Sequence, residues 1–130
     1  MKSISVLTSQ QEEFQDITDL VNALVRQSSC EDGVCHVFCP HTTAGLTINE
    51  CADPAVVLDM KAALASLIPD EGLWQHAEGN SPAHVKASLV GSSVMIPVVG
   101  GRLALGTWQG VFLCEFDGPR TREVWVLTKS

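Results

Sequence analysis

The 130-residue sequence has no apolar run long enough to cross a membrane, and it has few basic residues. A membrane-spanning helix needs about 20 apolar residues, and residues 1–8 also lack the apolar centre of a signal peptide. Eight lysines and arginines stand against 15 aspartates and glutamates, for a net charge of −7. Because the electrostatic field of this negative charge repels nucleic acids and anionic membranes, neither is an expected partner.

Paired CxxC motifs of the zinc-binding kind are absent, as are linkers, low-complexity tracts and internal repeats. The odd set of cysteines consists of Cys30, Cys35, Cys39, Cys51 and Cys114. Without a signal peptide they are expected to be free thiols of a protein kept in the reducing cytoplasm. Residues 1–130 are expected to form a single domain.

The spacing of the hydrophobic residues, together with the residues that begin and end helices, predicts three helices. They are expected over residues 17–25, over 54–67 after the N-cap Asp53, and over 82–89 after the N-cap Ser81. Short β-rich stretches are expected to form strands in the first dozen residues and at 33–39, 46–48, 94–99, 102–105, 111–116 and 123–127. Several strands with few helices and no regular alternation predict an α+β fold, and the glycine fingerprint of a dinucleotide-binding fold is missing.

Four segments carry polar side chains where the surrounding pattern favours apolar ones. They are residues 41–50 (HTTAGLTINE), the pair Asp53 and Asp59, residues 76–86, and residues 106–122. Each segment also has a purely structural interpretation. A histidine in an acidic loop is usually solvated, Asp53 can simply cap its helix, and the Asp-Gly-Pro within 106–122 can be only a turn.

Taken together, these residue types are those of a polar active site. Imidazoles and carboxylates bind divalent ions, with carboxylates favouring Mg²⁺ and histidines favouring Zn²⁺. The third predicted helix presents backbone N–H groups to an anion at its start, beside Asn80 and Ser81. Lys86, Arg120 and Arg122 add positive charge that suits phosphate oxygens.

Four segments of the chain together resemble the YjbQ family, small bacterial and archaeal proteins associated with a secondary thiamine-phosphate synthase activity. The segments are HTTAGLTINE at 41–50, the ADPAVVLDM that follows, EGN…AHVKASLVG at 78–91, and GRLALGTWQGVFLCEFDGPR at 101–120. The resemblance runs from about Val34 to Val126. It implies β-sandwich-type sheets with about three helices packed on them, and a homotrimer whose polar motifs lie near a subunit boundary.

The resemblance also implies which residues form the site for a phosphorylated small molecule. The expected catalytic residues are His84, Glu50, Asp53 and Lys86. The expected substrate contacts are Thr42, Asn80, Trp108, Gln109 and Arg120. A divalent metal is implied as cofactor, and the ligands expected for an ion such as Zn²⁺ are His41, His76 and His84.

The implied reaction joins a pyrimidine, carried as its diphosphate ester, to thiazole phosphate and releases pyrophosphate, either as the main role or as a weak side activity. Charge on the leaving diphosphate must be stabilised, usually by Mg²⁺ with cationic side chains. On this hypothesis His84, Lys86 and Arg120 hold phosphates, and Glu50 or Asp53 holds Mg²⁺. Two alternatives stay open: an enzyme or binder for another phosphorylated metabolite, and a metal-binding or assembly protein whose histidines are only ligands.

Overall fold

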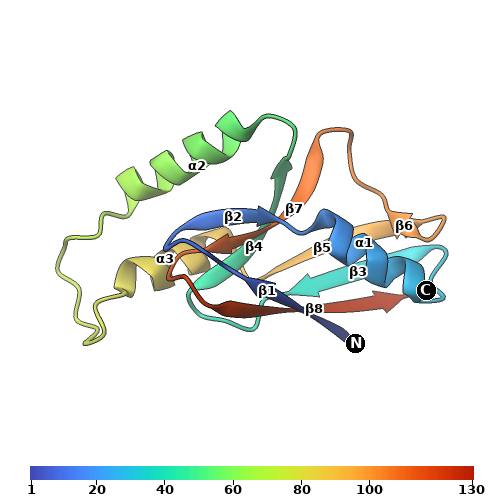
Figure 1. The fold of residues 1–130 in the computed structure, drawn as a ribbon, viewed down its shortest axis with the longest axis horizontal. Coiled ribbons are helices and arrows are strands. Elements are labelled where there is room, and N and C mark those ends of the chain that lie inside the picture. The colour runs from blue at the N-terminus through green and yellow to red at the C-terminus, as the bar shows by residue number, and fades with distance from the viewer.

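The computed structural model describes residues 1–130 as two antiparallel sheets with three helices packed on them (Figure 1). The helices are α1 (Thr18–Gln27), α2 (Pro54–Leu67) and α3 (Ser81–Val90). The strands are β1 (Lys2–Leu7), β2 (Glu13–Asp16), β3 (Gly33–Phe38), β4 (Ala44–Glu50), β5 (Ser93–Val99), β6 (Arg102–Leu103), β7 (Gln109–Glu115) and β8 (Thr121–Lys129).

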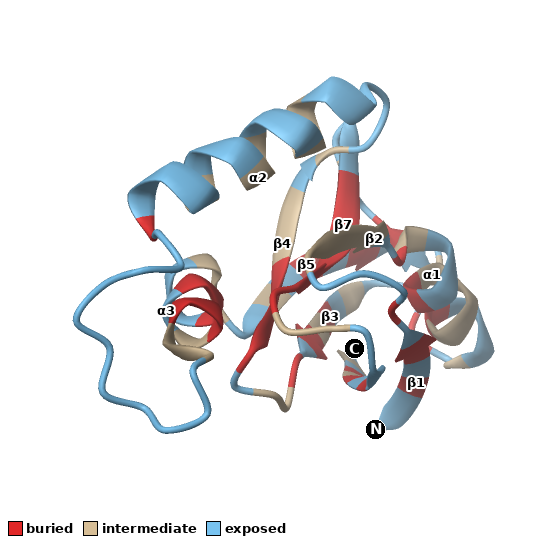
Figure 2. Ribbon diagram, turned by 60° about the vertical axis from the view of Figure 1, so that its left-hand side comes forward, coloured by how far each residue is buried: buried red, intermediate tan, exposed pale blue.

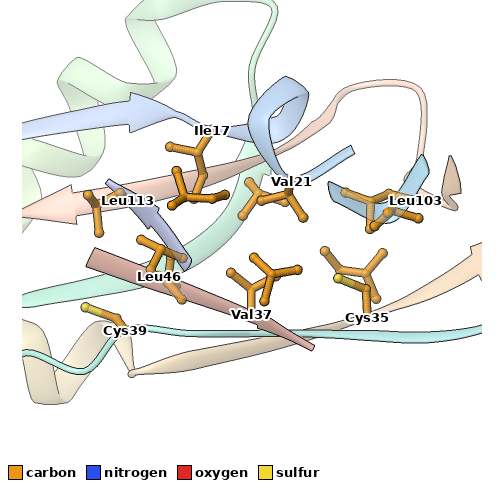
Figure 3. Close-up of a cluster of buried hydrophobic side chains, with 14 of the residues drawn as sticks. Ile17, Val21, Cys35, Val37, Cys39, Leu46, Leu103 and Leu113 are labelled. Carbon is orange, nitrogen blue, oxygen red and sulfur yellow. The ribbon is translucent and has the colours of Figure 1, made fainter. Parts of the chain in front are cut away.

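The two sheets face each other across the main core. One sheet has the strand order β1-β8-β3-β5-β6, and the other has the order β2-β7-β4. The core is a cluster of 18 buried residues drawn from both sheets and from α1 (Figure 3). Strand β7 shows the alternation that makes this possible: Val111 and Leu113 face the main core, whereas Phe112 and Cys114 face the other side.

Helix α1 covers one end of the sandwich. Its apolar stripe places Val21 and Val25 in the main core, next to Ile17 from the residue before the helix. Figure 3 shows Ile17 and Val21 directed toward the side chains of both sheets. The helix is held in place because burial of an apolar face, not propensity alone, stabilises a helix of 10 residues.

Helices α3 and α2 lie on the outer face of the three-stranded sheet. Ala83 and Ala87 of α3 are buried against Phe112, and α3 approaches β4 closely because Gly45 has no side chain. A Cβ at Gly45 would lie only 2.6 Å from the carbonyl oxygen of Gly91. Helix α2 differs, because none of its residues is buried despite its apolar sequence, and its ribbon in Figure 2 is pale blue and tan.

The predicted α+β class and the three helices are confirmed, with two local differences. Strand β2 was not predicted, and the residue preceding α3 in the N-cap position is Asn80 rather than Ser81. No helix reaches the length and apolar character needed to cross a membrane.

Candidate functional site

A cavity of about 480 Å³ lies between the loop that follows β3 and helix α3. We call it the His41 cavity; its polar lining consists of two imidazoles and three hydroxyls, from His41, Thr42, His84, Ser88 and Ser92. The loop supplies the first two side chains, and α3 with the residues after its C-terminal end supplies the rest. The structure therefore brings together three predicted site residues from two of the polar segments, namely His41, Thr42 and His84.

His41 is fixed in this cavity by the backbone of β8. Its Nε2 accepts a hydrogen bond from the backbone N–H of Glu123 at 2.9 Å, so the ring hydrogen of the neutral imidazole is on Nδ1. Burial, and then the positive charge of Arg122, lower the pKa of His41 below its ordinary value. His41 is therefore a neutral hydrogen-bond donor through Nδ1, and metal ligation through Nε2 would require the bond to Glu123 to break.

Behind the cavity lies an ion pair between Arg122 of β8 and Glu115 of β7. The two side chains are 2% and 0% exposed. Arg122 Nε donates to Glu115 Oε1 at 2.8 Å, Nη2 donates to the other carboxylate oxygen, and the Thr8 hydroxyl donates to Oε1 at 2.8 Å. Burial by itself raises the pKa of Glu115, but hydrogen bonds from Arg122, the Asp117 N–H and Thr8 hold it below its usual range.

Arg122 is therefore not available to a phosphate, contrary to the prediction that grouped it with Lys86 and Arg120. Neither residue was predicted to belong to a buried ion pair, although the sequence pattern carries a signal for it. Arg122 alternates with Val124 and Val126, which are both buried, so its side chain is on the inward face of β8. Glu115 ends the apolar run of β7, where a lone carboxylate needs a buried partner.

Lys86 and Asn80 line a different cavity, of about 350 Å³, on another side of α3. Two residues along a helix turn by about 200°, so Lys86 points away from His84. Lys86 is 2% exposed and its Nζ lies 3.0 Å from Glu12 Oε1. Arg120 is held by a carboxylate of the same cavity, that of Asp117, which also accepts a hydrogen bond from Asn80 Nδ2 at 2.9 Å. Both predicted phosphate-binding cations thus have acidic partners.

Glu50 and Asp53 lie at the far end of β4, in a groove of about 320 Å³ that we call the acidic groove. Its carboxylates come from Asp16, Glu50 and Asp53, and its apolar walls include Phe14, Val57, Leu58 and Phe112. Asp53 caps α2 as predicted, because Oδ1 accepts the N–H of Ala55 at 2.9 Å. Gln109 lies opposite Glu50 in the β4–β7 register, and the neighbouring Trp108 is 62% exposed.

The predicted site residues therefore do not all lie close together within one chain. β4 separates the His41 cavity from the acidic groove, and its seven residues span roughly 20 Å at about 3.4 Å per residue. His76, the third predicted metal ligand, has its ring 5.3 Å from that of His84, centroid to centroid. No three His, Cys, Asp or Glu side chains of the chain are grouped closely enough to hold a metal ion.

The chain is similar in sequence and fold to proteins of bacteria and archaea. Residues 2–129 match the family described as UPF0047 protein YjbQ-like. The UPF0047 protein YugU of Bacillus subtilis is 46% identical over 127 residues, covering 97% of this chain and 96% of its own length. The UPF0047 protein MJ1081 of Methanocaldococcus jannaschii is 49% identical over 121 residues, covering 93% of this chain and 88% of its own length.

Solved structures agree with these sequence matches. The crystal structure of an uncharacterized conserved protein of the YjbQ/UPF0047 family from Clostridium acetobutylicum is 51% identical, with a TM-score of 0.97 over 99% of this chain and 100% of that one. The conserved hypothetical protein TT1486 of Thermus thermophilus is 45% identical, with a TM-score of 0.93 over 99% of this chain and 100% of that one. The chain belongs to the YjbQ/UPF0047 family.

Proposed function

We propose that this chain is an enzyme acting on phosphorylated small molecules, with its ligand in the His41 cavity. The main support for the proposal is that His41, Thr42 and His84 line one cavity of about 480 Å³. Small-molecule sites commonly have volumes of roughly 300–1,000 Å³ and a few convergent polar groups. N–H and O–H donors of this kind suit the oxygens of a phosphate ester.

In its most specific form, the proposal is the thiamine-phosphate synthase reaction that the family resemblance implies. The pyrimidine loses pyrophosphate and becomes joined to thiazole phosphate, so negative charge develops on the leaving oxygens. Donors that are already aimed at those oxygens lower the barrier. His41 would act as a fixed Nδ1–H donor, and His84 as a second donor or as the general acid.

Mg²⁺ suits the acidic groove better than it suits the histidines. Both side-chain oxygens of Glu50 and the Oδ2 of Asp53 make no hydrogen bond within the chain, and Mg²⁺ prefers one or two carboxylates together with substrate phosphates. Bound there, Mg²⁺ would neutralise charge on the diphosphate. Zn²⁺ needs at least three protein ligands, and His76 and His84 provide only two while His41 Nε2 is engaged.

We further propose that the His41 cavity of one copy meets the acidic groove of a neighbouring copy in a homotrimer. The separation of roughly 20 Å along β4 supports this arrangement, since one small substrate cannot span both places within a chain. The apolar side of α2 supports it as well. Leu58 and Leu67 are 63% and 72% exposed, and exposed apolar patches of this kind commonly mark protein interfaces.

The test is Mg²⁺-dependent release of pyrophosphate from the two substrates by the purified protein and two histidine variants. His84→Ala should lower turnover by roughly 10²-fold or more, the usual contribution of a positioned acid. His36→Ala is the matched control, because His36 lies on β3 and lines a different pocket with Phe38; it should keep turnover within about twofold. Full activity of His84→Ala would refute the proposed role of the cavity.

The alternatives make different predictions in a thermal-shift titration of metal-stripped protein. A ligand that binds only the folded state raises the melting temperature. A shift with pyrophosphate or thiamine phosphate that grows with Mg²⁺, but no turnover, would favour a binder or an enzyme of another phosphorylated metabolite. A shift with Zn²⁺ alone would favour the metal-binding hypothesis, for which the neighbouring rings of His76 and His84 offer two ligands.

A further inference from the structure

The buried Arg122–Glu115 pair makes no contact with the space of the His41 cavity, but it is connected to both of its walls. The first connection is to the loop. Arg122 Nη2 donates to the carbonyl oxygen of Thr43 at 3.2 Å and to its Oγ1 at 2.8 Å, and both neighbours of Thr43 line the cavity. The residue after Arg122, Glu123, donates its backbone N–H to His41.

The second connection runs to α3. Glu115 Oε2 accepts the backbone N–H of Asp117 at 3.0 Å. The Asp117 carboxylate then accepts a hydrogen bond from Asn80 Nδ2 at 2.9 Å. The carbonyl oxygen of Asn80 accepts the backbone N–H of His84 at 3.3 Å in the first turn of α3. Three hydrogen bonds therefore link Glu115 to the backbone that carries His84.

The backbone at Gly118 approaches Glu115 so closely that no side chain fits between them. A Cβ added at Gly118 would lie 2.9 Å from Glu115 Cγ and from Thr8 Oγ1, and 2.3 Å from the carbonyl oxygen of Gln10. The close approach of the Gly118 backbone limits the room on one side of Glu115, and the planar guanidinium of Arg122 allows few orientations against its carboxylate. Loop and helix are thus both attached to one rigid buried unit.

We propose that the Arg122–Glu115 pair positions the two walls of the His41 cavity, and thereby sets the orientation of His41 and its approach to His84. The pair acts as a positioning device and touches no ligand. Its importance for a reaction rests on the proposed function, whereas its effect on His41 does not. Functional groups need to be held to within about 0.5 Å, which the two chains of hydrogen bonds can achieve.

The decisive variant keeps the fold but removes the connections. Replacement of a buried ion pair by apolar residues of similar volume is often neutral for stability, so Glu115→Leu/Arg122→Met should remain folded. A second variant, Arg122→Lys, keeps the charge but loses the forked contact with both Glu115 and Thr43. Arg102→Lys is its control, because Arg102 is an exposed residue of β6.

Two readouts separate positioning from stability. Nitrogen chemical shifts of the imidazoles report the tautomer of His41 without any ligand; the wild type should hold the hydrogen on Nδ1, and both test variants should shift toward the Nε2–H form that a free imidazole prefers. Calorimetric titration with pyrophosphate should show about tenfold or greater loss of affinity in the test variants. Arg102→Lys should match the wild type in both readouts.

A folded double variant with an unchanged His41 tautomer would overturn the proposal. If the double variant does not fold, the tautomer in Arg122→Lys decides the question in the same way. If the tautomer changes as expected but even the wild type fails to bind pyrophosphate, the positioning role stands and the proposed phosphate site fails. The failures of the two proposals are therefore distinguishable.

Discussion

The two ends of β4 differ in how completely one chain builds them. At the Ala44 end, Glu115 and Arg122 are at most 2% exposed and are joined to both walls of the His41 cavity by hydrogen bonds. At the Glu50 end, carboxylates and Trp108 face solvent beside a helix with no buried residue. Buried contacts within the chain therefore hold the first end, whereas the second end presents its carboxylates and Trp108 to solvent.

The largest difference between the two ends should appear in stability. Arg122→Ala leaves Glu115 buried without its partner, and breaking a buried pair in this way costs about 3–5 kcal/mol. Asp53→Ala at the other end should cost only about 1 kcal/mol, the usual value of an N-cap. Urea unfolding at one fixed protein concentration measures both changes, and equal losses would show that the ends do not differ in this respect.

Mixing two impaired variants should show whether the His41 cavity of one copy and the acidic groove of another form one site. His84→Ala alters the cavity end, and Asp53→Asn alters the groove end while still capping α2, because asparagine is an equally good N-cap. Each variant alone should lose roughly 10²-fold in turnover. After subunit exchange in an equal mixture, about a quarter of the sites formed between copies carry neither change, and activity should return to that extent.

The measurement is pyrophosphate release before and after the exchange, with each variant incubated alone as the control. Recovery of activity would show that the two ends form one site. If activity stays at the level of the single variants although exchange has occurred, the cavity and the groove belong to separate sites.

The close packing of α3 on β4 should also matter more than packing at the groove end. Gly45→Ala brings a Cβ to 2.6 Å from the Gly91 carbonyl oxygen, so backbone must move, and overpacking of this kind costs about 1–3 kcal/mol. Gly106→Ala is the matched control, since its Cβ would meet only the end of the Gln109 side chain at 3.3 Å. That variant should lose less than about 0.5 kcal/mol. Thermal or urea unfolding compares the two.

The smallest expected effect is a pH dependence from His41. Its pKa is lowered by burial and then by Arg122, so the unfolded chain takes up a proton there more readily than the folded one. Its contribution to stability is therefore complete above the ordinary histidine pKa of about 6.5 and is lost as the pH falls through the lowered pKa. His41→Gln should flatten the stability profile below about pH 6.5.

Unfolding curves across that range measure the effect, with Ser92→Ala as a cavity variant that does not titrate in it. A His41→Gln profile parallel to that of the wild type would show that His41 has the same proton affinity in the folded and unfolded chain.

How far the sequence predicts this structure depends on how strongly each segment is patterned. The three helices were predictable because their apolar residues recur at helical spacing and their ends are marked, for α2 by Asp53 and Pro69. Strand β2 was missed because its four residues include a single apolar one, Phe14. What stabilises β2 is its pairing with β7, which is a tertiary interaction that local pattern does not reveal.

The site was predictable as a list of residues but not as an arrangement. Motif resemblance named His41 and His84 as residues of one site, and the structure places both in the lining of one cavity. It also grouped Lys86 with His84, although two residues on a helix face different directions. The resemblance also assigned Glu50 and His41 to one site near a subunit boundary, and within one chain the length of β4 separates these two residues.

The cysteines give the chain a built-in chemical probe of the groove. All five are free, but only Cys51 is exposed, and it lies in the acidic groove. The other four are at most 4% exposed, and burial raises the pKa of Cys35 to about 11 and also raises the pKa of Cys39 and Cys114. Since alkylating reagents react with thiolates, we expect a maleimide to modify the folded chain at Cys51, and the rate of that reaction tests whether the proposed assembly covers the groove.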